Sequence, residues 1–490
     1  MMPTQLKQLA LYASLLATAS LVSACATNPV TGNSDFVLMS EEQEISLGRQ
    51  ANTQILKETP VYADPKLEQL VQQVGEELAS HSHRPELFYR FTVLDSTAIN
   101  AFALPGGYIY ITHGLLAYLN SEAELAAVLG HEIGHVTARH SVRQQSTAAV
   151  TGILGAVVSA STGVQGVDTL TDMASTAIVR GYGRDHELEA DRLGAEYLAK
   201  SGYDPNAMLE VVGVLKNQEA FETLVAEKEG RQANVYHGLF STHPDNDARF
   251  QEVINAAQLY KKGTTNRVNR ESFLRTLDGL TFGDSTREGI IRGNRFYHEP
   301  LDFTLTFPEN WRIENQAEKI VAISPDNDGL LQMSITDLNK RITAKQFMEQ
   351  RMQLKNLRAG STFKNGEMEG YTAIADSNTT FGIRAVRYVV IYHGTSAYIF
   401  AAAAKNKMDS SRFDDDILVT ARSFRGLTAA DNPFAREKKL AVIRTPKGVS
   451  YARLAAESPI TNYPEIQLRL LNGAYPKGEP ETSQLIKVVR

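Results

Sequence analysis

The N-terminal half of the chain is patterned mainly at the spacing of amphipathic helices. Apolar residues at helical intervals, in places preceded by acidic residues, predict helices over residues 40–56, 65–79, 121–140 and 184–200. Ser40 with Gln43, and Ser121 with Glu124, have the separation of a capping box. A helix is therefore expected to begin after each of these two serines.

Strand patterns interrupt the helices at two places. Residues 88–94 alternate between apolar and polar positions, and residues 107–112 are rich in the β-branched and aromatic side chains that strands favour. The strand over residues 108–112 has two interpretations, an exposed edge to which an extended peptide substrate adds or an interior strand. We expect residues 25–265 to form a mostly helical domain with a small sheet.

One internal segment is markedly apolar. Residues 148–160 (AAVTGILGAVVSA) combine apolar and small side chains, which predicts a packed helix or a flexible cover. A surface that touches lipid or substrate is the alternative. No segment after the N-terminus has the unbroken apolar length of a transmembrane helix.

The pattern changes beyond residue 296, which makes the expected fold class of the whole chain α+β. We expect an α+β accessory domain over residues 297–430, after a linker at 266–296. Its strands are predicted over residues 301–307, 320–323, 331–335, 385–392 and 397–402, and its helix over 343–357. In residues 440–490 the order strand, helix, helix, strand resembles a LysM-like fold, which implies contact with cell-wall glycan. A docking domain is the alternative.

The first 24 residues have the features of an export signal. Lys7 is the only charged residue among the first ten, and the apolar run that follows over residues 9–22 is too short to span a bilayer. The run ends in Val22-Ser23-Ala24-Cys25, which resembles the lipobox of bacterial lipoproteins and implies acylation of Cys25. An ordinary signal peptide that leaves a free thiol is the alternative. Ala26 follows instead of Asp, which by analogy favours the outer membrane of a Gram-negative bacterium, facing the periplasm.

Composition and charge narrow the classes of function. A chain of 490 residues is too long for one compact core, and 43% hydrophobic with 22% charged residues is usual for globular protein. The formal net charge of −6 offers no basic surface for nucleic acid, so no nucleic-acid partner is expected. Cys25 is the only cysteine, so a metal site must be built from His and carboxylate side chains.

Residues 131–135 (HEIGH) form an HExxH motif inside a predicted, capped helix. One helical turn separates His131 from His135, so both imidazoles can reach one ion. Glu132 projects from the next position round the helix, where it can contact a water on the metal. Zinc lowers the pKa of such a water toward neutrality, and the carboxylate takes the proton as the oxygen attacks a carbonyl carbon. The motif predicts a hydrolase with one Zn²⁺ per chain.

Two histidines leave a catalytic zinc one protein ligand short. Residues 184–194 (RDHELEADRLG) offer several acidic residues in a later predicted helix. Glu187 and Asp191 share one face, whereas Glu189 lies about 200° from Glu187 round the axis. One carboxylate on that face would bind the metal while its neighbour orients a ligand histidine. Spacing does not decide firmly between Glu187 and Glu189, and a solvated acidic face is the alternative.

Several motifs resemble those of the M48 metallopeptidases and occur in the same order. They are NAFALPGG at residues 100–107, YIYIT at 108–112, SEAELAAVLGHEIGHVTARH at 121–140 and ELEAD at 187–191. The resemblance covers about residues 28–260 and extends to the bacterial periplasmic lipoproteins of that family. It implies a zincin-like domain of the gluzincin type, with zinc ligands His131, His135 and Glu187. It also implies that Glu132 is the general base and that Asp191 supports the ligands from behind.

The positions of three further histidines in the sequence indicate their roles. His243 lies in STHPD at residues 241–245, and in similar proteins such a segment approaches the metal. We expect it to stabilise the oxyanion, or to bind zinc as a fourth ligand and keep the enzyme latent, and a backbone-bonded loop histidine is the alternative. A continuous helix would turn His140 about half a turn away from His131, so it is predicted to face away from the metal. His186 is assigned to the surface.

These observations lead to three hypotheses of function. The first is a zinc-dependent endopeptidase that acts on unfolded or misassembled envelope proteins. The second is a periplasmic assembly factor or chaperone with a mainly latent zinc site. The third is a glycan-binding anchor of the cell wall. The expected partners are envelope protein substrates, the membrane through a lipid on Cys25, and peptidoglycan or the envelope assembly machinery.

Overall fold

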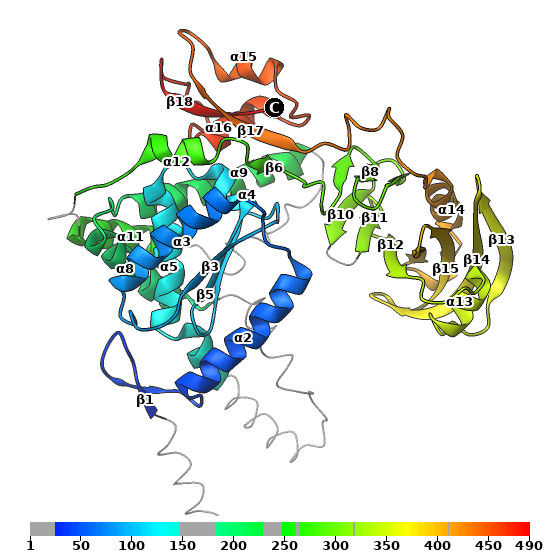
Figure 1. Ribbon diagram of the computed structural model, residues 1–490, viewed down its shortest axis with the longest axis horizontal. Helices are drawn as coiled ribbons and strands as arrows, with labels where there is room; N and C mark the ends of the chain where they lie inside the picture. The colour runs from blue at the N-terminus through cyan, green and yellow to red at the C-terminus, as the bar shows by residue number, and fades with distance from the viewer. Residues whose placement is uncertain (1–24, 148–181, 229–246, 261–264, 317–318, 410) are drawn as a thin grey trace, which may run out of the picture. The chain divides into compact units, whose positions relative to one another are not determined.

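The computed structural model describes residues 25–147, 182–228, 247–260, 265–316, 319–409 and 411–490. The chain divides into two compact units (Figure 1). Unit 1 comprises Met1–Phe282 and Lys439–Arg490, and unit 2 comprises Gly283–Lys438. Both units combine helices with sheets, which confirms the α+β class.

Unit 1 begins with helices and small sheets. Its elements up to residue 282 are β1 (Cys25–Thr27), β2 (Ser34–Phe36), α2 (Glu41–Glu58), α3 (Pro65–Ser80), β3 (Arg90–Leu94), β4 (Ala101–Leu104), β5 (Tyr108–Thr112), α4 (His113–Tyr118), α5 (Glu122–Thr137), α8 (Arg184–Lys200), α9 (Ala207–Lys228), α11 (Asp247–Tyr260), α12 (Arg270–Thr276) and β6 (Thr281–Phe282). The capping box predicted at Ser40 and Gln43 begins α2, and Ser121 accepts the N–H of Glu124 at the start of α5.

The strand β5 lies in the middle of its three-stranded sheet. β3 pairs with it in parallel and β4 pairs with it antiparallel, so the order is β3-β5-β4. All five of its residues are buried. The interpretation of residues 108–112 as an exposed edge is therefore wrong, because a neighbouring strand occupies each side of its backbone. β4 lies at an edge of this sheet, next to α5.

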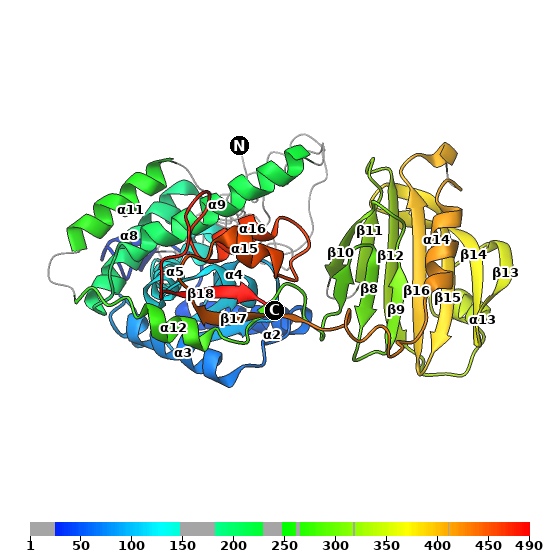
Figure 2. The same ribbon diagram turned by 90° about the horizontal axis from the view of Figure 1, so that it is seen from above.

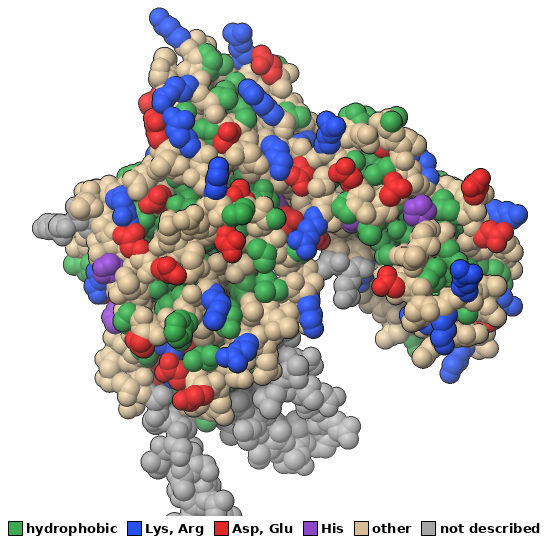
Figure 3. All heavy atoms as spheres, viewed as in Figure 1, with side chains coloured by type: hydrophobic (Ala, Val, Ile, Leu, Met, Phe, Trp, Pro, Cys, Tyr) green, Lys and Arg blue, Asp and Glu red, His purple; other side chains and the backbone are tan. Residues whose placement is uncertain are grey.

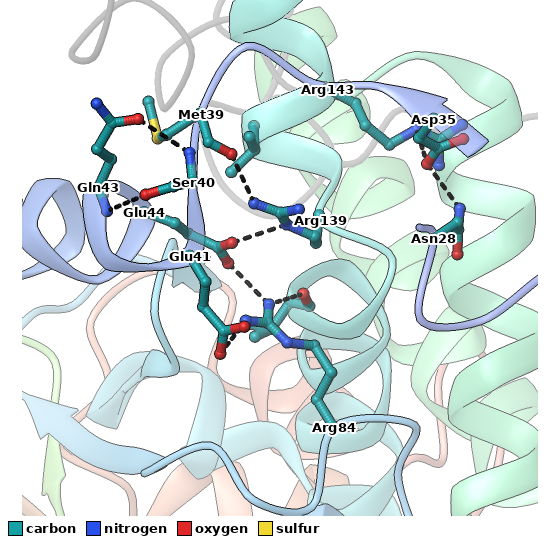
Figure 4. A network of polar contacts seen from close by, with 12 residues as sticks. Asn28, Asp35, Met39, Ser40, Glu41, Gln43, Glu44, Arg84, Arg139 and Arg143 are labelled. Carbon is teal, nitrogen blue, oxygen red and sulfur yellow. Dashed lines mark hydrogen bonds and ion pairs between the residues drawn. The ribbon is translucent and has the colours of Figure 1, made fainter. Parts of the chain in front are cut away.

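The helix α5 ends earlier than the predicted residue 140. Arg139 has a left-handed backbone with φ of 53°, and helical structure resumes over residues 140–147. The buried carboxylate of Glu44 holds this turn, since it accepts from Arg139 Nε and from Arg84 at 2.8 Å each (Figure 4). Arg139 also donates to the carbonyl of Met39 at 3.1 Å. These charge-assisted bonds offset the cost of about 1–2 kcal/mol for a left-handed residue with a side chain.

The C-terminal segment belongs to unit 1. Its elements are β17 (Lys438–Arg444), α15 (Tyr451–Ala456), α16 (Pro464–Leu471) and β18 (Leu485–Val489), in a sheet of order β18-β17-β6. Figure 2 shows β18 beside α12 and α16 beside α4. Leu440, Leu468 and Leu485 share one hydrophobic core with Leu125 and Leu129 of α5. The chain thus returns to unit 1 here, whereas we expect from the sequence that residues 440–490 form a small unit of their own. The likeness to LysM stays a prediction.

Unit 2 is built on one large antiparallel sheet. Its elements are β7 (Ile290–Arg292), β8 (Arg295–His298), β9 (Phe303–Thr306), β10 (Arg312–Gln316), β11 (Lys319–Ile323), β12 (Gly329–Asp337), α13 (Ala344–Gln350), β13 (Arg358–Asn365), β14 (Met368–Thr379), β15 (Gly382–His393), β16 (Ser396–Ala404), a short 3-10 helix (Lys407–Asp409) and α14 (Asp414–Ser423). The large sheet has seven strands in the order β10-β11-β12-β16-β15-β14-β13, and β7, β8 and β9 form a separate three-stranded sheet. Val389 and Ile391 pack with Ile417 of α14, while Val390 packs with Phe347 of α13. Because alternate residues of a strand face opposite ways, the two helices cover opposite faces of the sheet.

His298 of unit 2 is expected to make the protein less stable in mild acid. Its ring stacks on Phe303, its Nδ1 accepts the N–H of Leu301, and burial lowers its pKa to about 4. Below pH 6.5 the unfolded chain takes up a proton that the folded chain refuses until about pH 4. Stability therefore falls as the pH falls through this window. Thermal unfolding of the wild type and of the His298→Phe variant, each at pH 7 and pH 4.5, measures this effect. The unfolding temperature should fall less for the variant than for the wild type between the two pH values. Equal falls would contradict this role of His298.

The surface carries both signs of charge. On the face drawn in Figure 3, acidic and basic side chains are interspersed, in keeping with the net charge of −6. Among the helices within the described ranges, none combines the length and hydropathy needed to cross a bilayer.

Candidate metal centre

Glycines let the two helices of the site approach each other closely. A Cβ atom added at Gly194 of α8 would lie 3.0 Å from the backbone nitrogen of His131. A Cβ added at Gly134 of α5 would lie 3.0 Å from the carbonyl oxygen of Ala190. Both distances are shorter than ordinary van der Waals contact, so larger residues would push α5 and α8 apart. The close approach brings the acidic side chains of α8 within reach of the two histidines of α5.

Replacing Gly194 with Ala should therefore destabilise unit 1 by about 1–3 kcal/mol and weaken metal binding, because the added methyl group meets backbone rather than a movable side chain. Gly213 in α9 is the matched control, since a Cβ there meets nothing within 4 Å. Ala at position 213 should be neutral or stabilise the helix by about 0.5–1 kcal/mol. Urea unfolding and zinc titration measure both effects. Equal behaviour of the two variants would show that the close approach is unimportant.

His131, His135 and Glu187 converge on one point. Nε2 of His131 lies 3.0 Å from Nε2 of His135, and the two carboxylate oxygens of Glu187 lie 3.5 Å from these nitrogens. All three residues are buried, and they make up the one group of His, Cys, Asp or Glu found within the described ranges that is arranged to hold a metal. The structure thus brings together the three residues that the M48 resemblance implied.

The donor set fits a zinc ion. Donors about 2.0–2.1 Å from a tetrahedral zinc are roughly 3.3 Å apart, which is close to the observed separations. Two imidazole nitrogens and one carboxylate are a known set for catalytic zinc and leave one position for water or substrate. The surroundings also favour a positive charge: burial opposes it, yet the hydrogen bonds to Asp191 and Glu187 raise the pKa of His131 to about 10.

Asp191 contacts one of the three converging residues, and Glu132 is adjacent to the same residue in the sequence. Oδ1 of Asp191 lies 2.9 Å from Nδ1 of His131, so the carboxylate accepts from that nitrogen and leaves Nε2 to face the metal. Glu132 follows His131 directly in α5, and its side chain is fully buried. Glu189, the alternative ligand, is not part of the converging group.

His140 does not face away from the metal site, so that prediction is wrong. Its Nδ1 lies 2.8 Å from Nδ1 of His135, and its Nε2 lies 3.1 Å from Glu189. The prediction assumed one continuous helix, whereas the left-handed Arg139 turns the chain back toward His135. Burial lowers the pKa of His140, and its hydrogen bond lowers the pKa of Glu189 to about 2. The angular position predicted for His140 is wrong because the helix is interrupted at Arg139, and positions after an interruption no longer follow from the helical repeat before it.

Two aromatic neighbours of the site were not recognised in the sequence. Tyr182 stacks on His135 with ring centroids 4.0 Å apart, and its hydroxyl lies 2.6 Å from that of Ser141. His186, which we assigned to the surface, is half-buried and stacks on His140 at 4.3 Å. Burial lowers its pKa to about 4. No sequence period marks Tyr182, because it precedes α8 in an irregular segment.

One predicted site residue and one predicted segment lie outside the described residues. His243 falls in residues 229–246, and the apolar segment 148–160 also lies outside the described residues. The backbone of Cys25 begins β1, while its side chain is not described. The roles of His243 and Cys25 therefore stay predictions.

Known proteins resemble the part of the chain that carries the site. Residues 65–257 match the model of Peptidase family M48. The Beta-barrel assembly-enhancing protease of Yersinia pestis is 31% identical over 247 residues, 48% of this chain and 48% of that protein. The protein of the same name from Escherichia coli (strain K12) is 32% identical over 240 residues, 47% of each chain. The Mitochondrial metalloendopeptidase OMA1 of Arabidopsis thaliana is 29% identical over 227 residues, 44% of this chain and 43% of that protein.

This chain thus matches about half the length of these relatives. The family match includes α5, with both histidines, and α8, with Glu187 and Asp191. Geometry and comparison therefore agree on the same two helices. Residues 65–257 of this chain, which include these two helices, are thus similar to peptidase family M48.

Proposed function

We propose that this chain is a zinc-dependent endopeptidase that hydrolyses peptide bonds in unfolded or misassembled proteins of the bacterial envelope. The observation that carries the proposal is the convergence of His131, His135 and Glu187 beside the buried Glu132. The match of residues 65–257 to family M48 supports the peptidase activity. The names of the Yersinia and Escherichia relatives support a role in quality control of the envelope.

In the proposed mechanism, Nε2 of His131, Nε2 of His135 and the carboxylate of Glu187 would hold the ion. Zinc bound there would lower the pKa of a coordinated water and polarise the scissile carbonyl. Glu132 accepts the proton of the attacking water and passes it to the leaving amine. Asp191 keeps His131 in the tautomer that presents Nε2. Burial of the site strengthens these interactions, because they act in a low dielectric.

His243 is proposed to act at the same site. Its two candidate roles, stabilising the oxyanion and capping the metal in a latent enzyme, predict opposite results for His243→Ala. Loss of the oxyanion donor lowers kcat, whereas loss of a cap raises activity. An unchanged rate would show that His243 has neither role and is a loop histidine bonded to the backbone.

The proposed location is the periplasmic face of the outer membrane, with a lipid on Cys25. The apolar run at residues 9–22 and the sequence Val22-Ser23-Ala24-Cys25 support this anchor. Fractionation of cells that express Cys25→Ser should move the protein from the membrane to the soluble fraction. Retention of the Cys25→Ser protein in the membrane fraction would contradict a lipid anchor on Cys25.

A mainly latent assembly factor is the second candidate, and the enclosure of the site favours it. His135 and Glu187 are no more than 1% exposed, and Tyr182 covers one face of the His135 ring. The cavity beside His135 and Tyr182 measures about 10 Å³, room for about one water molecule. In this candidate function a peptide reaches the metal only after the site opens. In this candidate function unit 2 and the LysM-like segment 440–490 bind the envelope assembly machinery or peptidoglycan, which pull-down with the whole chain would detect.

Metal analysis paired with proteolysis tests the main proposal. Purified Cys25→Ser protein should contain about one zinc per chain and cleave casein, and a chelator should abolish the cleavage. Zinc should restore it after the chelator is removed. A folded sample that neither contains nor binds zinc would refute the proposal. Zinc without cleavage would favour the latent assembly factor.

A further inference from the structure

A chain of hydrogen bonds runs behind the metal ligand His135 and has no part in the mechanism above. Nδ1 of His135 lies 2.8 Å from Nδ1 of His140, and Nε2 of His140 lies 3.1 Å from Oε2 of Glu189. Arg143 donates to the same oxygen of Glu189 at 3.0 Å. The three contacts connect a ligand on α5 to a carboxylate on α8 and to the helical turn that follows Arg139.

The direction of each hydrogen bond follows from the metal site. Nε2 of His135 faces His131 and Glu187, so it is the nitrogen that binds the ion and Nδ1 carries the proton. That N–H donates to Nδ1 of His140, which must be an acceptor. His140 then carries its own proton on Nε2 and donates it to Glu189. Every link has one donor and one acceptor, so the chain is self-consistent only with neutral His140 and ionised Glu189.

The surroundings leave His140 little freedom to move. The side chain is fully buried, and its ring stacks on His186 at 4.3 Å and meets His135 edge-on at 4.9 Å. The turn that places it is held by the ion pairs between Glu44 and the two arginines Arg84 and Arg139 (Figure 4). A ring fixed in this way can hold the imidazole of His135 at one angle to the metal.

We infer that His140 and Glu189 are positioning residues for the metal ligand His135, as Asp191 is for His131. This inference rests on the proposed function, because it assumes that the three converging residues hold zinc. Ligand histidines whose second nitrogen is bonded bind metal more tightly, since the tautomer and the ring angle are set in advance. With Asp191 on His131 and His140 on His135, each of the two histidines has its Nδ1 bonded to the protein and its Nε2 left for the ion.

Four variants of the Cys25→Ser protein test the inference. His140→Phe keeps an aromatic ring and removes the acceptor, so the zinc dissociation constant should rise about 10- to 100-fold. His140→Asn restores an acceptor near Nδ1 and should recover most of the affinity. Glu189→Ala, at a partly exposed position, should raise the constant less than His140→Phe. His186→Phe is the control, because it keeps the stack on His140 and removes none of the hydrogen bonds between His135, His140 and Glu189. Its zinc affinity should stay within about twofold of the wild type.

Two measurements report on the metal without relying on turnover. Competition with a chelator gives the zinc affinity, and the visible spectrum of bound Co²⁺ reports the coordination geometry. We expect a shifted spectrum in His140→Phe and a spectrum like the wild type in His140→Asn and His186→Phe. Wild-type affinity and spectrum in His140→Phe would overturn the inference, as would an equal loss in His186→Phe. If His140→Phe does not fold, unchanged values in Glu189→Ala overturn it. Failure of the wild type to bind zinc would instead overturn the proposed function.

Discussion

Replacing Glu132 with Gln is expected to lower kcat/KM for casein cleavage by about 10²–10⁴-fold and to leave the bound metal in place. The two side chains have nearly the same shape, but the amide cannot accept the proton of the attacking water. The ligands His131, His135 and Glu187 are untouched, so metal content should equal that of the wild type. The loss belongs to the chemical step and should appear in kcat.

Glu196→Gln is the control for this experiment, since Glu196 lies on α8 with Glu187 but pairs with Lys200 and Tyr260. It should cleave casein at the wild-type rate. A Glu132→Gln enzyme that keeps more than about a tenth of the activity would show that Glu132 is not the general base. If the same variant repairs every envelope defect of a deletion strain, the latent assembly factor becomes the better account.

Replacing Lys487 with Ala is expected to lower the free energy of unfolding of unit 1 by about 3–5 kcal/mol. Lys487 is fully buried in β18, and its Nζ donates to the carbonyls of Ala117 and Leu119 at the end of α4. Alanine would leave two buried carbonyls without their donor and open a cavity. Burial lowers the pKa of Lys487 well below its ordinary value and raises that of Glu124 to about 7.

The single tryptophan gives this prediction an internal control. Trp311 lies in unit 2, against Phe413 and a core separate from that of unit 1. In a urea titration of Lys487→Ala, the far-ultraviolet transition of unit 1 should shift to lower urea, while the Trp311 fluorescence midpoint stays unchanged. Lys477→Ala, at an exposed position of the same segment, should behave as the wild type. A variant at 487 as stable as the one at 477 would show that the C-terminal segment is only loosely attached.

Local signals in the sequence predicted the parts of the molecule that depend on neighbouring residues. The three-residue spacing from Ser40 to Gln43 predicted a capping box, and the structure has it. The four-residue spacing from His131 to His135 predicted two imidazoles on one face, and they converge. Helical period and capping act over one or two turns, so a short stretch of sequence contains the information. The third ligand needed more, and the family resemblance selected Glu187 where spacing alone did not.

Tertiary structure decided whatever depends on residues far apart in the chain. Glu44 on α2 stabilises the left-handed Arg139, and this break turns His140 toward His135. The pairing of β4 with β5 places residues 108–112 inside the sheet rather than at its edge. Lys487 of the last strand donates to the carbonyl of Ala117 in α4, 370 residues earlier in the chain. The HExxH motif by itself determined two of the three side chains that can hold a metal, because both lie on one helix. Their support came from distant partners, whose positions follow from packing and not from any period in the sequence.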